Sequence, residues 1–150
     1  MRVVIQRVLS ASVHISGQQH AVIGRGLLVL VGTEANDTDV DVVWMSGKIA
    51  RLRIFPDEAG KMNLSLAEIE GEVLVVSQFT LFASTKQGNR PSFLKAAAPS
   101  LAIPRYEDFL RQLAVDTARP IQSGVFGADM QVALVNDGPV TICMDSHQRE

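Results

Sequence analysis

Cysteine is almost absent from this sequence: Cys143 is the only one among 150 residues, so no internal disulfide can form. Long apolar runs are missing too. None approaches the ~20 residues that a membrane span needs, and Arg7 interrupts the apolar start of the chain, so we expect neither a membrane helix nor a signal peptide. These absences predict a reducing, cytoplasmic location.

An excess of charge of either sign is also lacking. The formal net charge is −2, which excludes a histone-like or tail-driven nucleic-acid binder, and we expect neither a DNA partner nor a membrane partner. Hydrophobic residues make up 47%, so the chain is not disordered, and its length fits one domain over residues 1–150.

Common catalytic motifs are missing as well. There is no Gly-x-Ser-x-Gly elbow, no Walker A sequence and no Gly-x-Gly-x-x-Gly loop. Cys143 and the three histidines have no zinc-ligand spacing, and no histidine lies beside a candidate nucleophile in sequence. We therefore expect no metal and no cofactor, and a Ser-His-Asp triad has no positive support.

The hydrophobic pattern predicts an α/β fold with more strand than helix. Two continuous apolar runs are typical of buried strands, and two segments with helical spacing predict helices. The chain opens with strand-like alternation over residues 3–15. The other expected strands are 26–32, 72–81, 129–135 and 140–144, and the expected helices are about 38–52 and 104–115.

Polar side chains interrupt the second apolar run near its end. Ser77, Gln78 and Thr80 follow a stretch of valine and leucine, and strand alternation would put Gln78 and Thr80 on one face, with Ser77 and Phe79 on the other. Buried polar groups are unfavourable unless they are hydrogen-bonded. Either the strand emerges into solvent here, or its end forms a polar site.

The segment Asn136-Asp137-Gly138-Pro139-Val140-Thr141 is the second unusual feature. Asn-Asp-Gly is typical of a hairpin turn, but a proline follows the glycine directly. Gly138 can adopt backbone angles closed to other residues, and a Gly-Pro bond can be cis for only ~0.5–1 kcal/mol. Local sequence alone favours a plain turn; the alternative is a cis bond that reorients the adjacent carbonyls.

A stretch without acidic residues is the third feature. Residues 73–106 hold no Asp or Glu, while Lys86, Arg90, Lys95 and Arg105 are present. Such a region suits an anionic partner such as the phosphates of a nucleic acid. A solvated loop whose composition arose by chance is the other interpretation.

These features together resemble the D-aminoacyl-tRNA deacylase family of the Gly-cisPro type. Ser77-Gln78-Phe79-Thr80-Leu81 and the segment 136–141 match its two most specific motifs, and the similarity covers nearly the whole chain. Asn89 departs from the family, which commonly has a second arginine in this basic loop. The resemblance implies a curved mixed sheet partly closed into a barrel, with two or three helices.

The resemblance also implies a homodimer with its active site at the subunit interface. Gly138 and Pro139 of one copy would reach the partner's pocket, beside its Ser77-Gln78-Phe79-Thr80 segment, and Arg7 would hold the Gly-Pro motif. Phe126 and Met130 would form part of the wall for the terminal adenosine. Lys86, Arg90 and Lys95 would contact the tRNA backbone.

The activity implied is hydrolysis of the ester that joins a D-amino acid, or glycine mischarged on alanine tRNA, to the tRNA 3′ end. Thr80 is either a nucleophile or a residue that only shapes the pocket. Two rival functions remain: a non-catalytic RNA-binding module, and a serine or threonine hydrolase of small esters. An aromatic content of 5% speaks against the RNA-binding module.

Overall fold

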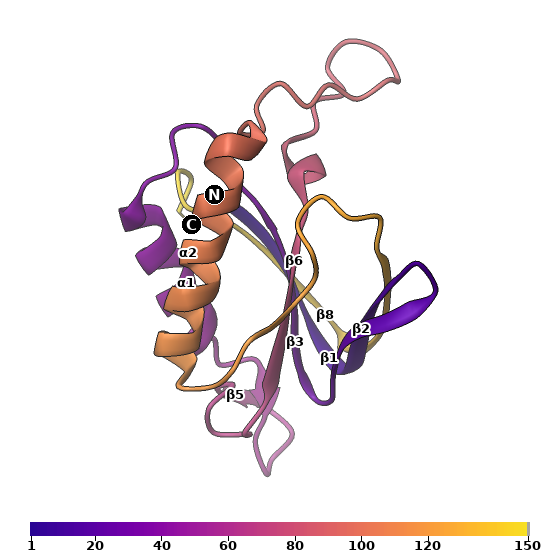
Figure 1. Cartoon of the computed structure of the whole chain (residues 1–150). Coiled ribbons are helices and arrows are strands. Elements are labelled where there is room, and N and C mark those ends of the chain that lie inside the picture. The colour runs from indigo at the N-terminus through magenta and orange to yellow at the C-terminus, as the bar shows by residue number, and fades with distance from the viewer. Residues whose placement is uncertain (150) are drawn as a thin grey trace.

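The computed structural model describes residues 1–149 and has a curled six-stranded mixed sheet, with two α-helices side by side on one face, and a separate two-stranded sheet (Figure 1). A short 3₁₀ helix, η1, follows one of the strands. The elements in chain order are β1 (Arg2–Ile15), β2 (Gln18–Ile23), β3 (Gly26–Gly32), α1 (Asp39–Arg51), β4 (Phe55–Pro56), β5 (Met62–Leu64), β6 (Glu72–Ser77), η1 (Phe79–Phe82), α2 (Pro99–Thr117), β7 (Gln122–Ser123) and β8 (Gln131–Asp145).

Strand β1 organises the sheet because it is long enough to pair with three neighbours. Its first half pairs with β3, its second half pairs with β2, and β8 runs antiparallel along most of its length. The strand order is β2-β1-β3-β6-β7, with β6 parallel to β3. The sheet therefore curls into a partly closed barrel, which confirms the predicted fold class.

Curling gives the sheet two apolar cores. The helices cover one face, where odd-numbered β3 residues such as Leu27 and Val29 meet Met45 and Phe109. The opposite face lies inside the curl, where Leu28 and other side chains form the second core. Strand β3 is thus buried on both faces, as its continuous apolar run predicts.

Helix α1 confirms the helix predicted at about 38–52. Thr38 and Asp41 form a capping box: the Asp41 carboxylate accepts hydrogen bonds from the Thr38 N–H (2.8 Å) and hydroxyl (2.9 Å). Burial raises the pKa of Asp41, but hydrogen bonds from Thr38 and Ser146 and the charge of His147 outweigh burial and lower it to about 2. Asp41 is therefore ionised at neutral pH.

Helix α2 is longer than the predicted 104–115. It begins at Pro99, and Pro104 lies inside it. Proline most often marks the first turn, where its missing N–H leaves no hydrogen bond unmade, so the sequence favoured Pro104 as the start. The helical spacing of Tyr106, Phe109, Leu110 and Leu113 predicts one inner face, and the structure buries Tyr106, Phe109 and Leu113 there, with Leu110 half-buried. Neither helix of residues 1–149 is long and apolar enough to cross a membrane.

The strand predicted at 72–81 is shorter than expected, because β6 ends at Ser77 and the chain turns into η1. The predicted alternation, with Gln78 and Thr80 on one face and Ser77 and Phe79 on the other, is therefore wrong. Beyond Ser77 the backbone no longer pairs with β3 as a strand, and a 3₁₀ turn sets the directions of these side chains.

The hairpin turn that local sequence favours at residues 136–139 is also wrong. Strand β8 continues through them, and the Gly138-Pro139 peptide is cis, as the alternative predicted. Pairing with β1 is interrupted here between Val8–Asn136 and Gln6–Thr141, beside a second register shift between Val8 and Ser10, and it continues on both sides. Register with β1 on both sides overrides the turn propensity of Asn-Asp-Gly.

Candidate active site

The end of β6 and the η1 turn form the polar site that the sequence left as an alternative. Gln78 leaves the strand but stays anchored, since its N–H donates to the Val31 carbonyl (2.7 Å). The Gln78 side-chain amide donates to the Thr80 hydroxyl. Within residues 1–149, the N–H groups of Phe79 and Thr80 have no hydrogen-bond acceptor, because they open η1 and no earlier turn precedes them.

A cavity of about 620 Å³ adjoins this turn. The predicted site residues Ser77, Gln78 and Phe79 line it together with Phe126 and Met130, so the structure brings these five together. Other side chains in the lining were not predicted from the sequence. They include Thr33, Phe93, Ala102, Tyr106, Asp129 and Val132.

Aromatic rings form much of the cavity wall. Phe79 and Phe93 meet edge to face, with centroids 5.1 Å apart, and Tyr106 and Phe126 lie 5.9 Å apart. Phe79 is nevertheless 56% exposed. Phe93 and Tyr106 escaped the sequence analysis because one lies in a loop noted only for its charge, and the other lies on the buried face of a helix.

Tyr106 fixes the floor of the cavity. Its hydroxyl donates to the Val75 carbonyl (3.1 Å). Burial raises the pKa of Tyr106 to about 12, and a hydrogen bond with Ser123 only partly offsets that rise. Tyr106 is therefore neutral at physiological pH and cannot act as a base there.

Thr80 has no base beside it. Among the described residues, its hydroxyl is hydrogen-bonded only to the Gln78 amide, and that group cannot take up a proton near neutral pH. The one carboxylate lining the cavity belongs to the exposed Asp129. The arrangement thus lacks the nucleophile–base pair of a Ser-His or Thr-amine enzyme.

Gly138, Pro139 and Arg7 lie away from this cavity. The buried Arg7 guanidinium donates to the carbonyls of Asp137 (2.9 Å) and Ile54 (2.5 Å), and it lies 3.2 Å from the Asp137 carboxylate. Gly138 has φ +140°, a conformation that favours glycine. Both Gly138 and Pro139 are exposed, so the motif faces outward from the body of the chain.

Strand register gives the distance between the Gly138-Pro139 motif and Ser77 along the sheet. Gly138 and Pro139 lie at the level of Arg7, which pairs with Leu27 on β3, whereas Ser77 pairs with Val31. That offset is about 13 Å along the strand direction, with β1 and β3 also lying between β8 and β6. One aminoacyl group held at Ser77 cannot touch the Gly-Pro motif of the same copy.

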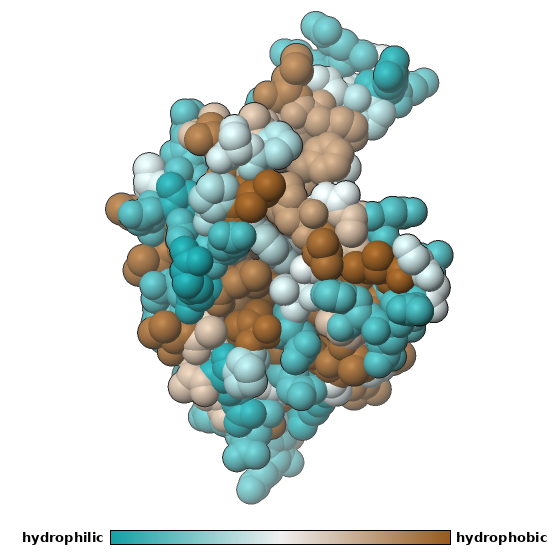
Figure 2. All heavy atoms as spheres, in the orientation of Figure 1, coloured by the Kyte–Doolittle hydropathy of each residue, from teal (hydrophilic) through white to brown (hydrophobic). Residues whose placement is uncertain are grey.

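The acid-free region contains an arm, residues 83–97, that extends from the body beside the cavity (Figure 1). Its hydrophilic tip and more apolar base are visible in Figure 2. Ser84 and Ser92 exchange backbone hydrogen bonds of 2.8 and 2.9 Å, which close the tip. Lys86 and Arg90 are exposed there, whereas Lys95 lines a separate hollow that also contains Glu34.

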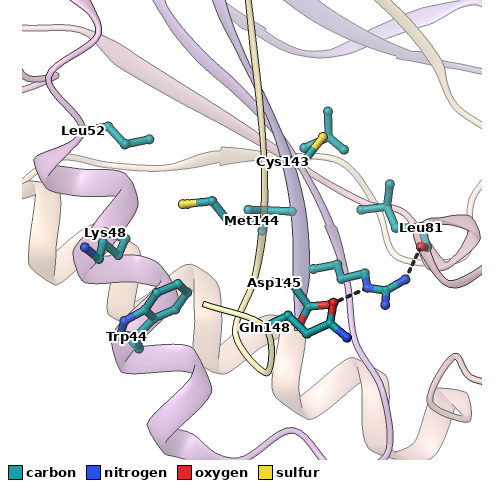
Figure 3. A pocket seen from close by; sticks show the side chains of 11 residues that line it. Trp44, Lys48, Leu52, Leu81, Cys143, Met144, Asp145 and Gln148 are labelled. Carbon is teal, nitrogen blue, oxygen red and sulfur yellow. Dashed lines mark hydrogen bonds and ion pairs between the residues drawn. The ribbon is translucent and has the colours of Figure 1, made fainter. Parts of the chain in front are cut away.

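Arg2 holds the far end of η1. Its guanidinium donates to the Leu81 carbonyl (3.3 Å) and to Asp145 (2.7 Å), as Figure 3 shows. These contacts cross a second cavity of about 540 Å³, between α1 and the end of β8, with Trp44 and Cys143 in its lining. Arg2 therefore links the turn that carries Thr80 to the last residues of the sheet.

A cluster that the sequence did not predict lies near the end of the chain. Ligand atoms of Glu34, Asp37 and His147 lie within 4.8 Å of one another. The buried Asp37 is already engaged, because it accepts from the Met1 amino group and lies 2.9 Å from the His147 ring. The cluster therefore serves to pack the chain ends against the helix start.

Comparisons with known proteins show which family this chain is similar to. The family model of D-Tyr-tRNA(Tyr) deacylase matches residues 4–145. Proteins named D-aminoacyl-tRNA deacylase from Cytophaga hutchinsonii and Flavobacterium johnsoniae are 61% and 58% identical over 150 residues, with both chains fully covered.

Solved structures are similar over nearly the same length. One titled c-Myc DNA Unwinding Element Binding Protein is 43% identical, has a TM-score of 0.90, and covers 97% of this chain and 98% of its own. A second, titled as a probable eukaryotic D-amino acid tRNA deacylase, shares the fold with a TM-score of 0.84 at 19% identity, and covers 95% of this chain and 97% of its own. The family model and the full-length relatives show that the chain belongs to the D-Tyr-tRNA(Tyr) deacylase family.

Proposed function

We propose that this protein hydrolyses the ester bond between a D-amino acid and the 3′ end of tRNA, which releases free tRNA. The observation that carries the proposal is the cavity of about 620 Å³ between the Ser77–Phe79 segment and an aromatic wall. Its volume lies within the ~300–1,000 Å³ typical of small-ligand sites, and aromatic faces suit a stacked base. Relatives named D-aminoacyl-tRNA deacylase, identical at up to 61% of positions, support the substrate class.

The terminal adenosine would occupy this cavity, with its base against Phe126 and Met130 and its esterified ribose toward Ser77 and Thr80. Glycine is achiral, so glycine mischarged on alanine tRNA is a second substrate of the same site. We place the reaction in the cytoplasm, where aminoacyl-tRNA is made and used.

Hydrolysis needs little chemistry from side chains because the aminoacyl ester is already activated. The N–H groups of Phe79 and Thr80, which lack acceptors within residues 1–149, are our candidates for stabilising the oxyanion. Thr80 shapes the pocket, and the neighbouring 2′-hydroxyl of the substrate assists the attack of water. The proposed route uses no cofactor and no metal.

Chirality would be read by the Gly138-Pro139 backbone. If the carbonyls of these residues face the α-carbon of the bound amino acid, an L side chain collides with them, while a D side chain points away. Such exclusion tolerates many D side chains because nothing grips them. The exposure of both residues and the hold of Arg7 on Asp137 support this role.

This chiral filter requires a homodimer. The offset of about 13 Å along the strands keeps the motif of one copy from its own cavity, so a second copy must supply it. Exposed apolar side chains occur on both parts that would meet: Leu9 and Val135 near the motif, and Phe79 and Leu94 near the cavity. Their pairing would bury surfaces that are otherwise costly to expose.

The arm would guide the tRNA. Lys86 and Arg90 at its exposed tip suit the phosphate backbone, and no carboxylate lies between residues 73 and 106 to oppose them. Lys95 also belongs to this proposed track, although Glu34 lines the same hollow and offsets part of its charge.

A substrate panel tests the proposal. The protein is incubated with D-aminoacyl-tRNA, with its L counterpart and with a free D-amino acid ester. The proposal expects release of tRNA from the D-aminoacyl substrate only. Cleavage of the free ester at a comparable rate would indicate a small-ester hydrolase, and binding without any cleavage would indicate an RNA-binding module.

A further inference from the structure

Strand β8 makes a short excursion at residues 137–140. On β1 a single residue, Arg7, separates the two paired positions, whereas the β8 side inserts four residues between Asn136 and Thr141. The inserted backbone therefore cannot be held by ordinary ladder hydrogen bonds from β1, and other groups must hold it.

The Asn136 side chain spans this excursion. Its Oδ1 accepts a hydrogen bond from the Val140 N–H (2.8 Å), and its Nδ2 lies 3.5 Å from the Val140 carbonyl and 3.3 Å from the Thr141 hydroxyl. A primary amide has one acceptor end and one donor end, like a peptide group. Asn136 thus replaces, from within the same strand, the partner backbone that β1 does not provide.

Two neighbours fix this amide in place. The Val140 N–H can only donate, so Oδ1 of Asn136 must face it. The Thr141 hydroxyl accepts hydrogen bonds from the side-chain amides of both Asn136 and Gln6 (3.2 Å from Gln6). Because Gln6 belongs to β1, this shared acceptor connects the Asn136 amide to β1. At the other end of the excursion, Arg7 holds the Asp137 carbonyl.

We propose that Asn136 is a positioning residue for chiral selection. It fixes the Gly138 and Pro139 carbonyls at the place where they exclude an L side chain in the partner's cavity. This inference rests on the proposed function. Arg7 fixes the start of the excursion and Asn136 fixes its end, so loss of either lets the carbonyls move. Sub-ångström freedom there weakens exclusion more than it weakens binding or hydrolysis.

The test compares rates of hydrolysis of D- and L-aminoacyl-tRNA by the full-length protein. Asn136→Ala should lower the D/L rate ratio by roughly tenfold, the effect of losing about one well-formed, partly buried hydrogen bond. Asn136→Asp keeps the acceptor for Val140 and should stay within about threefold of the wild-type ratio. Gln131→Ala, exposed on the same strand, is the matched control and should leave the ratio unchanged.

A merely structural role for Asn136 would lower the melting temperature and both rates together, and would leave the D/L ratio unchanged; that result overturns the inference. If Asn136→Ala does not fold, Asn136→Leu keeps the volume without the polar groups, and a wild-type ratio in that variant overturns the inference equally. A wild-type protein that cleaves both enantiomers alike would instead refute the proposed function itself.

Discussion

Replacing Thr80 by alanine separates the two roles open to this residue. Thr80→Ala removes a half-buried hydroxyl whose only hydrogen-bond partner among the described residues is the Gln78 amide. If Thr80 only shapes the pocket, the loss is that of one ordinary hydrogen bond. Such a bond contributes about 0.5–1.5 kcal/mol, which corresponds to a rate reduction of roughly two- to tenfold.

If Thr80 were the nucleophile, Thr80→Ala would reduce the rate far more. Removing the nucleophile of a covalent enzyme reduces kcat by a factor on the order of 10⁶. The rate reductions expected for the two roles therefore differ by several orders of magnitude, so the assay separates them. The absence of a base beside Thr80 in the described structure favours the smaller effect.

The assay is single-turnover hydrolysis of D-aminoacyl-tRNA, which isolates the chemical step from product release. Thr85→Ala, which removes an exposed threonine hydroxyl at the start of the arm, is the control. A parallel experiment uses wild-type protein and tRNA ending in 2′-deoxyadenosine, which should be cleaved much more slowly. A loss above about 10³-fold in Thr80→Ala, or a trapped aminoacyl ester on Thr80, would refute the reasoning.

Three further substitutions test other parts of the molecule. Replacing Lys86, Arg90 and Lys95 by alanine should raise KM for tRNA and flatten the salt dependence of binding, with kcat and chiral preference nearly unchanged; normal binding at all salt concentrations would show that the arm is only a solvated surface. Asp41→Asn should lower the free energy of unfolding by about 2 kcal/mol at neutral pH, because the folded pKa of about 2 lies below the ordinary aspartate pKa of 3.8. This deficit is present above pH ~4 and should shrink as pH falls through about 2 in urea titrations, since below that pH the carboxyl is protonated in both the folded and the unfolded state. Gly138→Ala puts a side chain at φ +140° and a Cβ 2.9 Å from a backbone nitrogen, so the Gly138 and Pro139 carbonyls should shift and the ratio of D- to L-aminoacyl-tRNA hydrolysis should fall by about tenfold or more while the protein stays folded; an unchanged ratio would place the chiral filter elsewhere.

The sequence predicted those parts of the fold that short-range patterns determine. The apolar run 26–32 could only be a strand buried on both faces, and the helical spacing after Thr38 located α1 within a residue or two. The cavity lining at Ser77, Phe126 and Met130 followed from the family resemblance. Periodicity would not have joined these segments, since they lie on separate elements.

What could not be predicted depends on long-range register. The Asn-Asp-Gly sequence favours a turn locally, but pairing with β1 on both sides keeps residues 136–139 within one strand. The end of β6 is likewise decided by where β3 stops offering partners, near Gly32. Tyr106 and Phe93 enter the cavity wall only after a helix and a loop are packed against the sheet. Propensity carries no information about such distant neighbours.

Strand β8 has a consequence beyond its place in the sheet. Val132, near its start, lines the cavity of its own copy, while Gly138 and Pro139, farther along, would serve the other copy. In the proposed dimer each β8 strand thus contributes to two active sites, one in each subunit. A copy with a defective cavity would be inactive in its own homodimer, and a copy with a defective Gly-Pro motif would fail to reject L-aminoacyl groups in its own. Together they would form a mixed dimer with one intact centre.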